Sequence, residues 1–331
     1  MKATVLGAAG GIGQSLSLLL KINCHLISEL SLYDVVNSHG VGADLSHIST
    51  NTSISSYLPE NDGLQKALCG ADFVIIPAGI PRKPGMTRDD LFSFNAKIIA
   101  SLAEGVARYC PGAFVLVISN PVNSTVPVFA ETLKKFGVFN ARKLFGVTTL
   151  DIVRAKTFIA DLTNKKPQSF RVPVIGGHSG ATIVPLFSVG APEAYSSLSY
   201  ETKSALIHRV QYGGDEVVEA KDGKGSATLS MAYAAYALVN QILTAVTSGL
   251  DNEVVSYIYL DDSIKGASEL KSKINGLDYF AIPVKLGKEG IEIIDSQILD
   301  RIDQAEGDML EEAIEKLQGD ISKGVSFIRG Q

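Results

Sequence analysis

The 331-residue chain lacks the surplus of basic residues that several classes of protein need. Its 30 Lys and Arg are outnumbered by 35 Asp and Glu, which gives a net charge of −5, and no run of basic residues occurs. Nucleic acids and anionic membrane surfaces are bound by concentrated Lys and Arg, so neither is expected as a partner. Any anionic ligand must therefore be held by a few local cations.

Cysteine is scarce. The three residues Cys24, Cys69 and Cys110 are far apart and form no Cys-x-x-Cys pair. A disulfide framework or a metal site is therefore not expected, and a reducing compartment fits better. We interpret all three as small buried hydrophobic residues.

Long apolar runs are also missing, because candidates such as residues 71–78 are only as long as a strand. No membrane span is expected. A first strand that begins at Lys2 leaves no room for a signal or transit peptide. We expect a cytoplasmic protein, with the mitochondrial matrix as the alternative if a presequence has been removed.

The first half of the chain alternates short β-rich runs with helical stretches. Dense apolar runs that read as strands are found at residues 3–6, 29–33, 73–76, 114–118 and 143–147. A leucine-rich segment at 14–21 reads as the first helix. Apolar strands separated by helices are typical of a parallel sheet that is covered on both faces.

The second half has a different pattern. Helices are predicted at 200–220, 226–247 and 300–324, with strands at 253–260, 279–286 and 291–294. Strands grouped between helices indicate a separate α+β domain. We therefore predict two domains, residues 1–146 and 147–331.

A glycine-rich turn joins the first strand to the first helix, with Gly7, Gly10 and Gly13 at a spacing of three. Glycines let a backbone approach a pyrophosphate, and a helix N-terminus supplies N–H donors and partial positive charge. This spacing is looser than Gly-x-Gly-x-x-Gly, so a turn without a ligand stays an alternative. The segment predicts a dinucleotide site.

Asp34 strengthens this prediction because it ends the second strand about twenty residues after the last glycine. A carboxylate there accepts hydrogen bonds from a ribose diol and repels a 2′-phosphate, which favours NAD over NADP. The alternative is an ordinary turn residue at a strand end. The predicted fold class is α/β, with a doubly wound parallel Rossmann sheet followed by an α+β domain.

A histidine among glycines, His178, follows a strand-like segment at 174–176. Upstream, Asp151 and Arg154 are three residues apart at the start of a helix and therefore share one helical face. A carboxylate and a guanidinium would then face the same space. The alternative is that His178 is an ordinary loop histidine.

Five segments together resemble the successive motifs of the malate dehydrogenases, in the branch shared by mitochondrial and many bacterial enzymes, with fungal forms nearest. They are residues 7–13, 82–86, 120–123, 150–154 and 175–180. The resemblance runs from Lys2 to near the C-terminus. It implies a homodimeric enzyme of the tricarboxylic acid cycle that interconverts malate and oxaloacetate with NAD.

The resemblance also implies roles for the residues of the second domain, which would be the catalytic one. His178 would exchange the substrate hydroxyl proton, since the unperturbed pKa of an imidazole suits this exchange. Asp151 would accept the other ring N–H and stabilise the imidazolium. Arg154 would grip the carboxylate beside the reacting carbon as a bidentate fork.

Further contacts are implied in the first domain. Arg82 would meet the distal carboxylate of the substrate and Arg88 would assist, both from a loop that closes as a lid. Asn120 would contact both substrate and nicotinamide. Asn95, and Met231 from the second domain, would contact the cofactor.

Three alternatives remain to be weighed. A lactate dehydrogenase-like enzyme shares the histidine, aspartate and carboxylate-binding arginine, and differs at the position of Arg82. A non-catalytic NAD-sensing module would be expected to lack His178, Asp151 or the arginines. Short-chain dehydrogenases need Tyr-x-x-x-Lys, which none of the eleven tyrosines provides, and no P-loop occurs.

Overall fold

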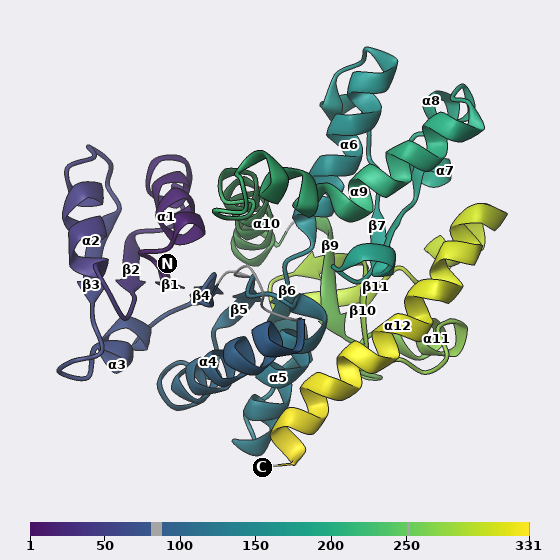
Figure 1. Cartoon of the computed structure of the whole chain (residues 1–331). Helices are drawn as coiled ribbons and strands as arrows, with labels where there is room; N and C mark the ends of the chain where they lie inside the picture. The colour runs from purple at the N-terminus through teal and green to yellow at the C-terminus, as the bar shows by residue number, and fades with distance from the viewer. Residues whose placement is uncertain (81–87, 250–251, 331) are drawn as a thin grey trace.

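The computed structural model describes residues 1–80, 88–249 and 252–330, without the side chains of residues 88 and 89. Its strands form one sheet with the order β3-β2-β1-β4-β5-β6-β9-β10-β7-β8, and β11 pairs with β10 (Figure 1). Helices cover the sheet. They are α1 (Gly11–Asn23), α2 (Ser38–Ser46), α3 (Gly63–Leu68), α4 (Arg88–Tyr109), α5 (Val122–Lys135), α6 (Thr149–Thr163), α7 (Phe187–Gly190), α8 (Pro192–Ser196), α9 (Tyr200–Ala220), α10 (Leu229–Ser248), α11 (Ala267–Lys273) and α12 (Gln304–Arg329).

The first six strands run parallel in the order of a Rossmann sheet. They are β1 (Lys2–Leu6), β2 (Glu29–Tyr33), β3 (Ser53–Tyr57), β4 (Phe73–Ile76), β5 (Phe114–Val117) and β6 (Leu144–Gly146). Every residue of β4 and β5 is buried, as expected for strands covered on both faces. The predicted parallel sheet is confirmed, although β3 was not predicted because this edge strand is rich in serine.

The second half extends the same sheet with antiparallel strands. They are β7 (Val174–Gly176), β8 (Ile183–Pro185), β9 (Asn252–Tyr259), β10 (Tyr279–Gly287) and β11 (Gly290–Ile294). A single residue pair, Gly146 with Tyr257, joins β6 to β9. Because one sheet continues through both halves, the division at residues 146 and 147 stays a prediction.

The C-terminal helix α12 packs on α5 and on the short turn Gly180–Thr182 before β8. In Figure 1 its C-terminal end lies beside α5. A Cβ at Gly324 would lie 2.2 Å from the carbonyl oxygen of Ser124, so only glycine permits the two helices to approach this closely. The helix therefore ties the second half of the chain to the first.

Two local predictions need correction. The last helix begins at Gln304 rather than at residue 300, because Asp303 and Glu306 form a reciprocal capping box and residues 296–301 form a 3₁₀ helix. Cys69 is exposed rather than buried, since it follows α3 in a surface turn.

The expectation that no segment could span a membrane also needs correction. By length and composition α10 is apolar enough to cross one, and half of that segment is buried inside the protein. It packs on α1 and on β9 and β10. A helix in the core of a protein can have the same length and apolar composition, so we assign α10 to the core.

Candidate active site

A cleft of about 610 Å³ opens at the carboxyl ends of β1, β4 and β5, where open α/β sheets bind ligands. One wall consists of the residues that follow these strands, namely 10–13, 77–80 and 118–121. The other wall comes from the second half of the chain and includes Ser179, Gly180, Gln211, Tyr212, Asp215, Thr228, Asp320 and Lys323. The cleft thus lies between the two halves.

The glycine turn has the geometry that a pyrophosphate needs. Gly7 has a φ of 97°, and a Cβ at Gly13 would lie 2.1 Å from the carbonyl oxygen of Gly7, so both positions require glycine. Gly10 is the N-cap of α1 and provides no side-chain cap. The first-turn amides of α1 therefore remain available to an anionic ligand. This part of the cleft fits a dinucleotide.

Asp34 is linked to this turn. Its Oδ2 accepts from the backbone N of Ala9 at 2.8 Å and its Oδ1 accepts from that of Val35 at 2.7 Å. Oδ1 also accepts from the backbone N of Val36 at 3.4 Å, whereas Oδ2 has one partner and can accept a second hydrogen bond, from a ribose hydroxyl. The carboxylate is therefore held at the strand end by the same loop that would hold the phosphates.

The structure brings His178 and Asp151 into direct contact, with 2.5 Å between Nδ1 and Oδ2. The Asp151 side chain is fully buried in the first turn of α6, and that of His178 is 10% exposed. A carboxylate only accepts hydrogen bonds, so Nδ1 of His178 carries the hydrogen and donates it to Asp151. Nε2 is the ring nitrogen left to exchange a proton. The pair has the arrangement of a general acid–base catalyst with its orienting acid.

Arg154 lies on the same helical face, with Nη1 3.7 Å from Oδ1 of Asp151. Burial lowers the pKa of its guanidinium, and the charges of Asp151, Glu216 and Asp215 partly offset this effect. The side chain is 12% exposed and has no hydrogen-bond partner among the residues that the structure describes. A desolvated guanidinium without such partners is costly, so an anionic ligand with acceptor oxygens fits here.

Asn95 connects two loops at the cleft. It is buried on α4, its Oδ1 accepts from the backbone N of Ile80 at 2.9 Å, and its Nδ2 donates to the carbonyl oxygen of Asn120 at 2.7 Å. Asn120 is exposed and lines the cleft. Its side chain has no partner within the described part of the chain. Asn95 thus positions Asn120, and a direct contact of Asn95 with the cofactor stays a prediction.

Three other predicted contacts stay predictions. Met231 is 4% exposed in the core face of α10 and does not line the cleft, so its cofactor contact stays a prediction. Arg82 lies outside the described residues. The side chain of Arg88, at the start of α4, lies outside them too.

Sequence reasoning missed the role of Asn123. This residue is 1% exposed, and its Oδ1 accepts from the backbone N of His178 at 2.8 Å. The only signal was its place in the Asn-Pro-Val-Asn segment, which gave no partner. It holds the backbone of the histidine turn.

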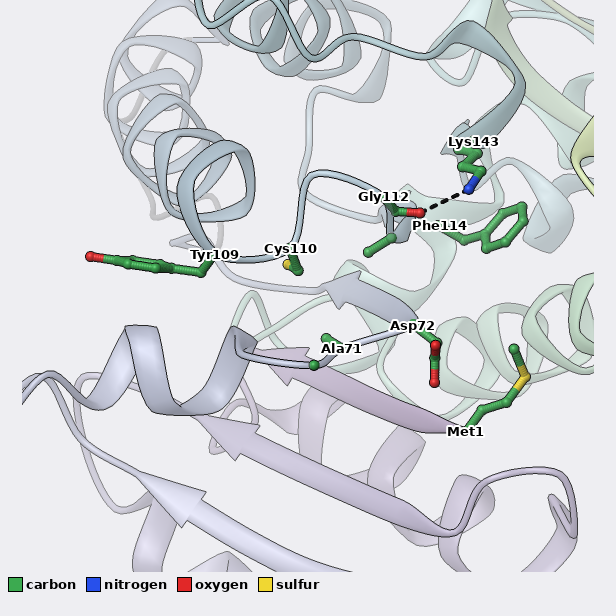
Figure 2. Close-up of a pocket in the computed structure, with 10 residues that line it drawn as sticks. Met1, Ala71, Asp72, Tyr109, Cys110, Gly112, Phe114 and Lys143 are labelled. Atoms are coloured by element: carbon green, nitrogen blue, oxygen red, sulfur yellow. Dashed lines mark hydrogen bonds between the residues drawn. The ribbon is translucent and has the colours of Figure 1, made fainter.

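A second cavity, of about 380 Å³, lies at the opposite edge of the sheet, by the amino ends of β1, β4 and β5 (Figure 2). Its two charged side chains are already engaged: Asp72 accepts from the backbone N of Lys2 at 2.8 Å, and Lys143 donates to the carbonyl oxygen of Gly112 at 2.9 Å. Burial raises the pKa of Cys110 to about 12, which makes this thiol unreactive. The cavity therefore offers no chemistry comparable to that of the cleft.

Comparison with known families decides the identity of the chain. The family model for the NAD binding domain of lactate/malate dehydrogenase matches residues 1–146. The model for the alpha/beta C-terminal domain of the same family matches residues 148–328. This chain belongs to the lactate/malate dehydrogenase family. The predicted family, fold class and NAD cofactor are thereby confirmed.

Individual members of this lactate/malate dehydrogenase family agree with the assignment. Mitochondrial malate dehydrogenase of Saccharomyces cerevisiae is 49% identical over 99% of the chain and 94% of the relative. Mitochondrial malate dehydrogenase 1 of Arabidopsis thaliana is 50% identical over 98% and 90%. The crystal structure of Cryptosporidium parvum malate dehydrogenase matches with a TM-score of 0.81 at 29% identity and covers 100% of this chain and 99% of that one.

Proposed function

We propose that this chain is an NAD-dependent malate dehydrogenase that transfers a hydride reversibly between malate and NAD, giving oxaloacetate and NADH. Relatives named malate dehydrogenase, about half identical over nearly the whole chain, confirm the enzyme class that the motifs predicted. The observation that carries the mechanism is the largely buried Arg154 beside the His178–Asp151 pair. An acid–base catalyst next to an anion site suits a 2-hydroxy acid.

The proton is exchanged at Nε2 of His178. In malate oxidation the neutral imidazole removes the hydroxyl proton, and in oxaloacetate reduction the imidazolium returns it to the carbonyl oxygen. NAD, when bound, supplies the hydride acceptor. Asp151 holds the ring through Nδ1 and stabilises the imidazolium, since its fully buried carboxylate lies 2.5 Å away.

Arg154 would grip the carboxylate beside the reacting carbon. Its guanidinium has no hydrogen-bonded protein partner in the described residues. Two of its N–H groups can therefore donate to the two oxygens of the substrate carboxylate. For the distal carboxylate we propose Arg82, assisted by Arg88, from their place in the motif. Asn120, on the wall of the cleft, would contact the substrate oxygen and the nicotinamide.

The distal arginine argues for malate over lactate. A lactate-type substrate carries a methyl group where malate carries its second carboxylate, so Arg82 would be desolvated without a partner. That loss costs on the order of 2–5 kcal/mol. A lactate dehydrogenase-like activity is therefore not favoured, and a non-catalytic NAD-sensing module would not need the His178–Asp151 pair.

Steady-state consumption of NADH tests the proposal. Oxaloacetate should be reduced with a kcat/KM at least about 10³-fold above that of pyruvate. A site built to bind a polar group discriminates strongly against a substrate that lacks this group. NADH should be preferred to NADPH. Equal rates with oxaloacetate and pyruvate would exclude the malate assignment.

A matched pair of arginine variants tests the anion site. Arg154→Gln should lower kcat/KM for oxaloacetate by about 10²-fold or more, since a charge-assisted bidentate contact is lost. Arg209→Gln, on the neighbouring α9, removes a guanidinium whose side chain is 47% exposed and pairs with Glu216. It should stay within about twofold of the parent. Equal losses in the two variants would refute the proposed role of Arg154.

Oligomeric state and compartment are finer points of the proposal. We propose a homodimer, which light scattering on a size-exclusion column would test. The Saccharomyces cerevisiae and Arabidopsis thaliana relatives are named mitochondrial, which favours the matrix over the cytoplasm expected from the sequence. Fractionation of the source cells with an antibody against this chain would decide between the two compartments.

A further inference from the structure

Asn123 contacts four groups at the catalytic turn. Its Oδ1 accepts from the backbone N of His178, and its Nδ2 lies within reach of Ser179 Oγ at 3.2 Å, Thr182 Oγ1 at 3.2 Å and Asp320 Oδ2 at 2.9 Å. Asp320 belongs to α12 and is 197 residues away in sequence. The amide of Asn123 therefore links the C-terminal helix to the backbone of the catalytic histidine.

The direction of the Asn123 amide decides whether this link can work. An amide can turn over and exchange its oxygen and nitrogen, and only one direction presents the oxygen to the N–H of His178. The hydroxyl of Ser179 can both donate and accept, so it does not select a direction. Oγ1 of Thr182 already donates to the carbonyl oxygen of Ser179 at 2.9 Å, so towards Asn123 it accepts, at a longer distance than Asp320 does. A carboxylate only accepts, so Asp320 requires the NH₂ group of Asn123 to face it.

We propose that Asp320 is a positioning residue for His178, acting through the side-chain amide of Asn123. The charge-assisted bond from Nδ2 to the carboxylate fixes the amide and polarises it, which strengthens acceptance by Oδ1. A catalytic group must be held within a fraction of an ångström of its productive geometry. The inference rests on the proposed function, because it concerns the same proton exchange.

The packing around Asp320 supports this role. Ser124, the next residue after Asn123, donates from Oγ to the carbonyl oxygen of Asp320 at 2.8 Å. Leu317, one turn earlier on α12, lies close to Gly177. A Cβ at Gly177 would be 2.8 Å from Cδ2 of Leu317. The helix is thus docked on both sides of the contact, and the position of the carboxylate is fixed.

Asp320 also lines the cleft, where a carboxylate opposes the binding of a dicarboxylate substrate. A negative charge in that place is unfavourable for binding. The hydrogen bond from Asn123 to the carboxylate of Asp320 positions the catalytic turn, and this benefit offsets the unfavourable charge. The positioning role therefore explains a feature that substrate binding alone does not.

An exchange of the two side chains tests the proposal. Asn123→Asp places two carboxylates against each other and should lower kcat at least tenfold. Asp320→Asn keeps an acceptor oxygen but lets either amide turn, and should lower kcat by about three- to tenfold. In the double variant the amide introduced at position 320 can donate to one oxygen of the carboxylate introduced at position 123. The other oxygen of that carboxylate can accept from the backbone N–H of His178, so kcat should recover to within about threefold of the parent.

The control is Asp308→Asn, an exposed carboxylate on α12 that pairs with Gln304, and its kcat should not change. KM for NADH and the melting temperature are measured for every variant, since a merely structural role would move these with kcat. A double variant no better than Asn123→Asp would overturn the inference, as would single variants with the kcat of the parent. Turnover of oxaloacetate by the parent is measured first, and its absence would instead refute the proposed function.

Discussion

Gly177, the residue before the catalytic histidine, gives the sharpest test of the site geometry. A Cβ at this position would lie 2.7 Å from Oδ1 of Asn123, 2.7 Å from Oγ1 of Thr182 and 2.8 Å from Cδ2 of Leu317. The two oxygens are held by hydrogen bonds to neighbouring residues. Neither neighbour can move without breaking one of these bonds.

The size of the effect of Gly177→Ala follows from these distances. Ordinary contacts of a Cβ begin at 3.4 Å, so the backbone of the histidine turn must move by about 0.7 Å. Because a misplacement of about 1 Å costs roughly 10²-fold in rate, kcat should fall by about 10- to 100-fold. Overpacking of this kind should also lower the free energy of unfolding by about 1–3 kcal/mol.

Initial rates of NADH oxidation with oxaloacetate and urea denaturation measure both effects. Gly319→Ala on α12 is the matched control, because a Cβ there would meet nothing within 4 Å. It should leave kcat unchanged and raise the free energy of unfolding by up to about 1 kcal/mol, since alanine is preferred in helices. A Gly177→Ala enzyme with the rate and stability of the control would show that the turn is not packed as described.

Four further predictions concern charge. Asp151→Asn should slow malate oxidation by about 10²–10⁴-fold, because an amide that donates to Nδ1 of His178 favours the wrong tautomer. In the parent, malate oxidation should rise with pH while oxaloacetate reduction falls, and flat initial-rate profiles in both directions would contradict the relay. Asp34→Ser should shift the ratio of kcat/KM for NADH and NADPH toward NADPH, and an unchanged ratio would remove the assigned role of the carboxylate. Burial raises the pKa of Glu306 despite its hydrogen bonds from Ser188. The protonated side chain therefore stabilises the fold fully below the ordinary pKa of 4.5, and this stabilisation is lost as the pH rises through the pKa of Glu306 in the folded protein. Glu306→Gln should therefore be more stable than the parent by on the order of 1 kcal/mol at pH 7 but not at pH 4, and denaturant titrations that show the same difference at both pH values would rule this out.

Local sequence signals predicted much of the fold. The apolar run at Phe73–Ile76 and the helix at Tyr200–Ala220 were predicted with the bounds that the structure shows. Both elements satisfy a local rule, since one is a dense apolar strand and the other a long helix with a serine N-cap. The strands β7 and β8 were not predicted as a pair, because segments of three residues contain no full period.

The candidate site was predictable to a different extent. Asp151 and Arg154 could be placed on one face from their spacing, and the match to the motifs supplied the pairing of Asp151 with His178. The contact of Asn123 with Asp320 could not be predicted, because it joins residues 197 positions apart and depends on how α12 docks. Side-chain contacts of this kind have no local pattern.

The distribution of charge around the cleft explains how an acidic chain can bind a dicarboxylate. Three carboxylates near the proposed site each interact with an identified group. Asp151 accepts from His178 and Asp320 accepts from Asn123, while the charge of Asp215 partly offsets the effect of burial, which lowers the pKa of Arg154. The guanidinium of Arg154 is by contrast buried and has no hydrogen bond to the described chain. Arg154 therefore offers positive donors beside the His178–Asp151 pair, although the net charge of the protein is −5. Since short-range donors act at contact while the net charge is screened beyond about 8–10 Å at ordinary ionic strength, added salt should weaken the binding of the substrate only slightly.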